Sequence, residues 1–149
     1  MVCLGNICRS PLAEAALRHH AERLGLDVVV DSAGTGSWHV GCPPDERAQA
    51  MAKRLGGIDI SGLRGRQLCQ ADFSAFDHII AMDNANMRHM RAMMPADATA
   101  RLSLMMDHLS GETGREVADP YYGDDADFAA TWRQVDAAAC AFAETMQRR

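Results

Sequence analysis

The segment that most constrains this chain is residues 1–11, MVCLGNICRSP, because it places a cysteine and an arginine at the two ends of a short glycine-containing loop. Gly5 lies between Cys3 and Arg9, so the backbone can curl until its N–H groups point at one concave spot. Backbone N–H groups arranged in this way bind an anion. The segment therefore predicts an anion-binding loop with a thiol inside it.

A helix is predicted to start directly after this loop. Ser10 suits the N-cap, Pro11 suits the first helical position, and residues 12–18 are strong helix formers. The partial positive charge at a helix N-terminus favours an anion in the loop, and the same surroundings favour the nucleophilic thiolate form of Cys3. The planar Arg9 guanidinium can hold two oxygens of a phosphoryl group. These features together predict a phosphate site that contains a nucleophile.

The Cys-x5-Arg pattern also arises by chance in a chain with five cysteines. The alternative interpretation is a buried Cys3 next to a surface Arg9, with no shared function. Gly5, the Ser-Pro helix start and the position of Cys3 at a predicted strand end favour the phosphate site instead.

Residues 2–11, VCLGNICRSP, resemble the signature of the low-molecular-weight protein tyrosine phosphatases. The resemblance extends in the same order to DSAG at 31–34, Trp38, MD at 82–83 and DPYYG at 119–123, over nearly the whole chain. It implies hydrolysis of phosphotyrosine in proteins through a phosphocysteine intermediate.

A long polar loop at residues 107–127 contains the predicted proton donor. Expelling a tyrosyl oxygen from phosphorus requires a proton, which the carboxylic acid of Asp119 could supply beside the thiolate. Standing alone, this motif would be better explained as an Asp-Pro turn with surface tyrosines. Combined with the phosphate loop, the motif predicts that Cys3 attacks phosphorus, Arg9 holds the phosphoryl oxygens and Asp119 protonates the leaving group.

The resemblance implies the remaining site residues. Trp38 and Tyr121 would form two aromatic walls around a phosphorylated ring, although a tryptophan in such a loop is more often a packing residue. Ser32 would belong to a hydrogen-bond network behind the loop, which Asn6 joins. Many relatives support this network with a histidine where this chain has Leu63, so we expect weaker or differently supplied support. The predicted substrate-binding residues of the loop and the helix start are Leu4, Gly5, Asn6, Ile7, Cys8 and Ser10.

The order of predicted elements indicates an α/β fold. A helical pattern at 11–24 precedes a β-rich run at 26–30 and a loop at 31–44, which begins a β-α-β alternation. We expect one three-layer domain over 1–149, with a four-stranded parallel sheet in the order 2-1-3-4, helices on both faces and the phosphate loop after strand 1. The other predicted elements are helices at 45–55, 71–76, 84–93 and 128–146 and strands at 77–81 and 101–105.

Strand 1 is expected to be the central strand, and strands usually have about five residues. Only Met1 and Val2 precede Cys3 in this sequence. We therefore expect that strand 1 is truncated, that Met1 is an internal methionine of it, and that the natural protein begins upstream.

Composition limits the classes of partner and cofactor. The net charge of -5 argues against nucleic acid as the main partner. No apolar stretch approaches the roughly 20 residues that span a bilayer, and no signal peptide is recognisable, so we expect a cytoplasmic location and no membrane partner. The five cysteines form no C-x-x-C pairs, which favours reduced thiols and argues against a disulfide framework or a zinc site. The expected mechanism requires no metal and no organic cofactor. Cys8 is expected to protect Cys3 by joining it in a disulfide on mild oxidation.

The predicted function is therefore protein tyrosine phosphatase, with phosphotyrosine-containing proteins as substrates and a tyrosine kinase as a candidate partner. A thiol-dependent arsenate reductase of the same fold is one alternative, but it relays electrons through two further cysteines, and residues 79–94 contain none. A phosphate or phosphotyrosine-binding module without turnover is another alternative. Such a module would not explain the presence of both Cys3 and Asp119.

Overall fold

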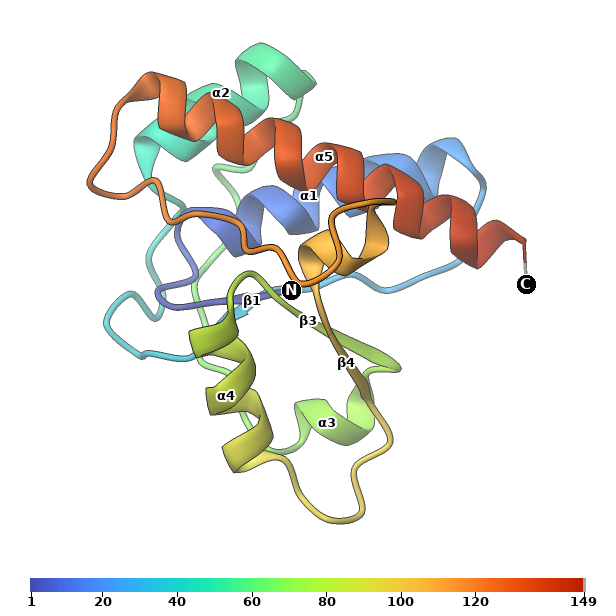
Figure 1. Cartoon of the computed structure of the whole chain (residues 1–149). Helices are drawn as coiled ribbons and strands as arrows, with labels where there is room; N and C mark the ends of the chain where they lie inside the picture. Colours follow the sequence, from blue (N-terminus) through green and yellow to red (C-terminus); the bar gives the residue numbers. More distant parts are fainter. Residues whose placement is uncertain (149) are drawn as a thin grey trace.

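The computed structural model describes residues 1–148, in which strands alternate with helices (Figure 1). Four strands form one parallel sheet in the order β2-β1-β3-β4, which confirms the predicted α/β class and strand order. The strands are β1 (Val2–Cys3), β2 (Ala33–Gly34), β3 (His78–Ala81) and β4 (Arg101–Leu104). The helices are α1 (Arg9–Arg23), α2 (Glu46–Gly56), α3 (Asp72–Ala75), α4 (Asn84–Met93) and α5 (Asp125–Gln147), with a 3-10 turn η1 (Met105–His108) before the last loop.

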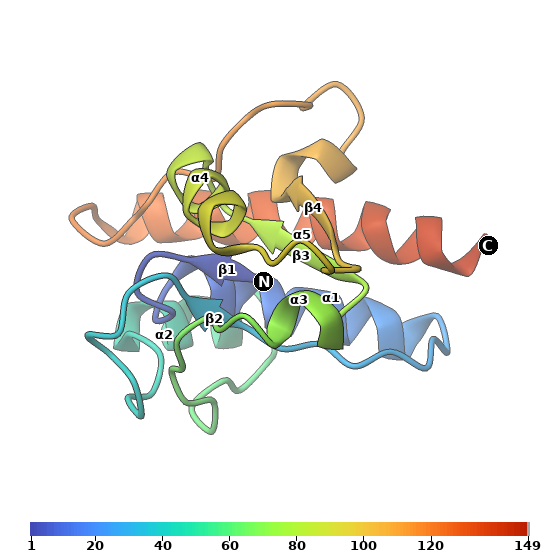
Figure 2. The ribbon, with the colours of Figure 1, turned by 90° about the horizontal axis from the view of Figure 1, so that it is seen from below.

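Two hydrophobic layers enclose the sheet. Helices α1, α2 and α5 cover one face, and α3 and α4 cover the other (Figures 1 and 2). Because strand side chains alternate between faces, Cys3 and Ile80 pack into the first layer, whereas Val2 and Ile79 pack into the second. The central strands are therefore buried on both faces, as expected for a parallel sheet.

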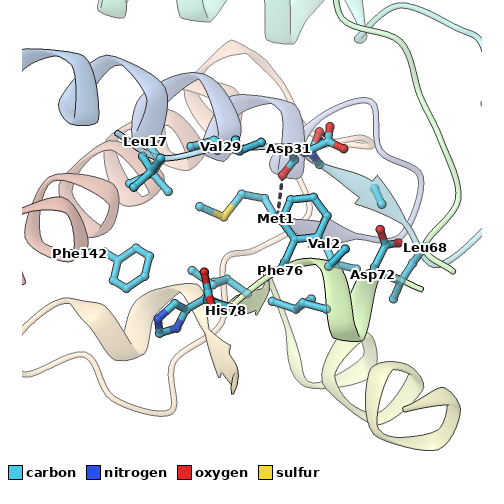
Figure 3. Close-up of a pocket in the computed structure, with 18 of the residues that line it drawn as sticks. Met1, Val2, Leu17, Val29, Asp31, Leu68, Asp72, Phe76, His78 and Phe142 are labelled. Atoms are coloured by element: carbon cyan, nitrogen blue, oxygen red, sulfur yellow. Dashed lines mark hydrogen bonds between the residues drawn. The ribbon is translucent and has the colours of Figure 1, made fainter. Parts of the chain in front are cut away.

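The predicted strand at 26–30 is wrong. The observed β2 is Ala33–Gly34, inside the segment that we expected to be a loop. A strand requires a neighbour for its ladder hydrogen bonds, and β2 finds one in β1, where Val2 pairs with Ala33. Residues 27–30 instead border a cavity of about 450 Å³ that separates them from β3 (Figure 3). Their β-rich composition therefore does not produce a strand.

The helix starts follow the capping rules at α2 and α4 but not at α1. Asp45 and Asp83 are the N-caps of α2 and α4, and each side chain accepts a backbone N–H of the first turn. Helix α1 begins at Arg9 with Cys8 as its N-cap and has no side-chain cap, so the predicted N-cap role of Ser10 is wrong. The Ser10 hydroxyl contacts the phosphate loop instead.

Helix α5 packs across α1 and α2 (Figure 1). It begins earlier than predicted because Asp124 and Asp127 form a capping box in front of it. Among residues 1–148, no helix is long and apolar enough to cross a membrane. The inner face of α5 buries Phe128, Trp132, Val135, Ala139 and Phe142, and Met146 packs partly buried against the same core.

The central position of β1 agrees with the sequence interpretation. Val2 pairs with β2 on one side and with β3 on the other. The upstream start of the natural protein stays a prediction.

Candidate active site

The loop between β1 and α1 leaves the carboxyl edge of the sheet, where ligands bind in open α/β folds (Figure 1). Cys3 is the last residue of β1 and is buried. The backbone N–H of Asn6 donates to Sγ of Cys3 at 3.2 Å, and Oγ of Ser10 lies 3.1 Å from the same sulfur. The thiol therefore lies inside the curl of the loop, in contact with a backbone donor and a hydroxyl.

Asn6 holds the loop in its curled shape. Its φ of 57° lies in the left-handed region, which side-chain-bearing residues seldom adopt and asparagine adopts more readily than most. The side-chain nitrogen of Asn6 donates to Oγ of Ser10 at 2.8 Å and to Oγ of Ser32 at 2.9 Å. Its side-chain oxygen accepts the backbone N–H of Arg66 at 3.0 Å. Three hydrogen bonds thus fix the residue whose backbone N–H points at the Cys3 sulfur.

A buried carboxylate of α1, Glu14, extends this network and was missed by the sequence reasoning. The Ser32 hydroxyl donates to Oε2 of Glu14 at 2.5 Å, and the Arg18 guanidinium lies 2.7 Å from Oε1. Burial raises the pKa of Glu14 above its ordinary value, while the Ser32 hydrogen bond and the Arg18 charge oppose that rise. The sequence did contain a sign of a buried carboxylate here, because Glu14 lies inside the run 12–17, whose other residues are all Ala or Leu.

Leu63 packs against the hydrophobic layer that contains α1, α2 and α5. The side-chain oxygen of Asn6 takes its hydrogen bond from the backbone of Arg66. The loop therefore receives support from a residue that the sequence interpretation did not consider.

Arg9 is a buried cation between two acidic residues. Its side chain is 3% exposed, and Nη1 donates to Oδ2 of Asp83 at 2.6 Å and to the Val117 carbonyl at 3.0 Å. Nη2 lies 3.4 Å from Oδ2 of Asp119. Since a buried charge is stable only when paired, these oxygens hold the guanidinium in one orientation at the loop. Asp83 thus caps α4 and also contacts Arg9. The contact with Arg9 was not predicted from the sequence.

Asp119 lies in the loop before α5, and its side chain is 43% exposed. One carboxylate oxygen accepts the backbone N–H of Tyr121 at 3.1 Å, and the other faces Arg9. The carboxyl group is thereby directed toward the pocket while one side remains open to solvent. This position suits a group that exchanges protons with a bound ligand and with water.

One pocket of about 220 Å³ unites these groups. Trp38 is 70% exposed, and its ring can lie against the chain only because residue 36 is glycine, where an added Cβ would lie 1.9 Å from that ring. The Arg47 guanidinium lies over the Tyr121 ring, 5.5 Å from its centre, within the range of a cation–π interaction. The lining consists of Cys3, Leu4, Gly5, Ile7, Cys8, Arg9, Trp38, His39, Asp119, Tyr121 and Tyr122.

Not every predicted substrate-binding residue lines this pocket. Asn6 and Ser10 are buried behind the loop, where their side chains contact each other instead of the opening. His39 and Tyr122 line the pocket but were missed, although each directly follows a predicted wall residue in the sequence. Among residues 1–148, no cluster of His, Cys, Asp and Glu side chains could hold a metal ion.

The comparisons with known proteins identify the family. The family model for low molecular weight phosphotyrosine protein phosphatase matches residues 1–149. The chain belongs to this family. Its resemblance in sequence to the low-molecular-weight phosphatases is thereby confirmed.

Individual members of the phosphatase family match at substantial identity. The low molecular weight phosphotyrosine protein phosphatase of Schizosaccharomyces pombe is 42% identical over 90% of this chain and 86% of its own length. The human protein of the same name is 37% identical over 96% of this chain and 91% of its own length. The crystal structure of YfkJ from Bacillus subtilis superposes with a TM-score of 0.90 at 37% identity, covering 99% of this chain and 92% of YfkJ. The structural match to YfkJ therefore agrees with the family that the sequence comparisons identify.

Proposed function

We propose that this chain hydrolyses phosphotyrosine in proteins, with Cys3 as nucleophile, Arg9 as phosphate ligand and Asp119 as proton donor. The observation that carries the proposal is the convergence of these three side chains on one pocket from two distant parts of the chain. A thiol, a buried guanidinium and a half-exposed carboxyl group are the functional groups that phosphoryl transfer through a covalent intermediate requires.

The reaction proceeds in two displacements. In the first, the Cys3 thiolate forms a bond to phosphorus as the bond to the tyrosyl oxygen breaks, and Asp119 gives its proton to that oxygen. Arg9 and the backbone N–H groups of the loop hold the equatorial oxygens as their charge moves. In the second, Asp119 takes a proton from water, the hydroxide forms a bond to phosphorus, and inorganic phosphate leaves as the thiolate is restored.

The pocket walls support a preference for an aromatic phosphoester. Trp38, Tyr121 and Tyr122 present three aromatic rings around the opening, and such rings favour stacking with a phenyl ring. A phosphoserine side chain has no ring to meet them. Domain extent over 1–149, a tyrosine kinase as partner and a cytoplasmic location belong to this proposal and stay predictions.

The alternative functions differ from this one in their chemistry. An arsenate reductase needs two further cysteines at the site, but Cys42, Cys69 and Cys140 do not line the pocket. A binding module would have no use for a carboxyl group held opposite the thiol.

Hydrolysis of p-nitrophenyl phosphate by the wild type and by Cys3→Ser tests the proposal. We expect vanadate-sensitive turnover in the wild type and none in the variant, which should still bind vanadate weakly because Arg9 and the loop amides remain. Faster hydrolysis of a phosphotyrosine peptide than of its phosphoserine counterpart should accompany this result. Turnover that survives in Cys3→Ser would overturn the assignment, and thiol-dependent reduction of arsenate without phosphatase activity would favour the reductase.

A further inference from the structure

Arg66 reaches the phosphate loop without lining the pocket. Its backbone N–H donates to the Asn6 side-chain oxygen at 3.0 Å, and its carbonyl accepts the N–H of Gly34 in β2 at 2.8 Å. The main chain of Arg66 therefore bridges the phosphate loop and the edge strand of the sheet.

The side chain of Arg66 joins two carboxylates. Nε donates to Oδ2 of Asp31 at 2.9 Å, and Nη1 donates to Oδ2 of Asp72 at 2.9 Å. Asp31 lies just before β2 and Asp72 begins α3, and Figure 3 shows Asp31 next to Met1 and Asp72 beside Leu68 at the border of the cavity. The Asp72 side chain is 9% exposed and also accepts the Cys69 backbone N–H, so this end of the bridge is firmly held.

The bridge fixes two of the three partners of Asn6. Oδ1 of Asp31 accepts the backbone N–H of Ser32 at 2.8 Å, so the Arg66–Asp31 pair holds the backbone of Ser32, the residue whose hydroxyl accepts from Asn6. The same guanidinium holds the backbone N–H of Arg66 in place. The Ser32 hydroxyl accepts a hydrogen bond from the Asn6 side-chain nitrogen, and the backbone N–H of Arg66 donates one to the Asn6 side-chain oxygen.

Resting on the proposed function, we propose that Arg66 is a positioning residue for the reaction. Its bridge to Asp31 and Asp72 holds Asn6 in the left-handed conformation that aims the Asn6 backbone N–H at the Cys3 sulfur. Without the bridge, Asn6 can relax toward an ordinary conformation, and the loop amides would no longer converge on the phosphoryl oxygens.

Arg66→Gln tests this role, and Arg64→Gln is the matched control. Arg64 lies two positions earlier and is exposed, and its guanidinium donates only to the backbone carbonyls of Ser61 and Leu63 among the hydrogen bonds described. We expect Arg66→Gln to lower kcat/KM for p-nitrophenyl phosphate and the affinity for vanadate by roughly tenfold to 100-fold each, since displacing a reacting group by about 1 Å can cost about 100-fold. The loss should be the same for good and poor leaving groups because Asp119 is untouched, and Arg66→Lys should recover part of it. Arg64→Gln should behave as the wild type.

A double-mutant cycle with Asn6→Gly separates positioning from general stability. Glycine removes the side chain of Asn6 without adding strain at positive φ, so the Arg66 substitution should have little further effect in that background. All rates are compared well below the measured melting temperatures, and Asp31→Asn, which breaks one arm of the bridge, replaces Arg66→Gln if that variant does not fold.

Unchanged turnover and vanadate affinity in Arg66→Gln would overturn the proposal. Equal losses with and without the Asn6 side chain would also overturn it, since Arg66 would then act by another route. If the wild type itself lacks phosphatase activity, the proposed function fails, while vanadate affinity still reports whether the bridge shapes the loop.

Discussion

The buried positive charge of Arg9 is paired by oxygen atoms of three residues. Its guanidinium has carboxylate or carbonyl oxygens from Asp83, Val117 and Asp119 around it, and the 2.6 Å contact to Asp83 is the shortest of the three. Asp83 therefore carries most of the pairing, and the longer, half-exposed contact to Asp119 contributes less. A weakly paired Asp119 suits the proton-donor role that we propose for it.

Asp119→Asn is the variant that tests this residue. Asparagine cannot donate a carboxylic proton, so hydrolysis of alkyl or unsubstituted phenyl phosphates should fall on the order of 10²-fold to 10⁴-fold. Cleavage of p-nitrophenyl phosphate should fall less, because nitrophenolate leaves without full protonation. Single-turnover rates across a series of substituted phenyl phosphates measure this directly. A uniform loss across the series would assign Asp119 a structural role.

The phosphate loop, as an element, holds two thiols with different properties. Both Cys3 and Cys8 are buried and line the pocket. Burial raises the pKa of the Cys8 thiol well above its ordinary value, and the nearby Asp45 carboxylate adds to this rise. Cys8 therefore remains a protonated thiol next to Cys3, the proposed nucleophile.

Mild peroxide is expected to inactivate the enzyme reversibly through this pair. Peroxide oxidises the Cys3 thiolate to a sulfenic acid, and the Cys8 thiol then forms a disulfide with it and releases water. Dithiothreitol should restore activity in the wild type, whereas Cys8→Ala should progress to irreversible loss. Mass spectrometry that finds Cys3 as a sulfinic acid beside a free Cys8 in the oxidised wild type would exclude the protective bridge.

The elements differ in how well local sequence predicts them. Helix α4 lies at the predicted 84–93 because the Asp83 cap and the apolar period agree. The run at 26–30 failed because β composition is not sufficient without a neighbouring strand, whereas Ala33 and Gly34 form β2 through their pairing with β1. Ser10 failed as an N-cap because its hydroxyl is used by Cys3 and Asn6.

At the scale of the whole molecule, the site combines local and distant residues. The loop from Cys3 to Arg9 is contiguous, so its motif is visible in the sequence. The contacts of Asn6 with Arg66 and of Arg9 with Asp83 join distant segments, and no spacing rule connects them. Only the packing of the layers brings these partners together.

Glu14 places a titratable group inside this packed structure and predicts a pH dependence of stability. Its pKa is raised from the ordinary 4.5, so just above that pH the folded protein binds more protons than the unfolded chain. The contribution of Glu14 to the free energy of unfolding therefore falls as pH rises through this window. Glu14→Gln does not titrate, so its stability relative to the wild type should increase over the same range. Urea unfolding at several pH values measures the difference, and a constant difference would show that Glu14 titrates normally.

Turnover by the proposed mechanism passes through a phosphoryl group on Cys3. The most direct measurement is rapid quenching of Asp119→Asn during hydrolysis of p-nitrophenyl phosphate, followed by mass spectrometry of the peptide that contains Cys3. The first displacement needs no proton for this substrate, while the second lacks its base, so phosphocysteine should accumulate at Cys3 and disappear once substrate is exhausted. Steady turnover with unmodified Cys3 throughout, or with the phosphoryl group on another residue, would contradict the account.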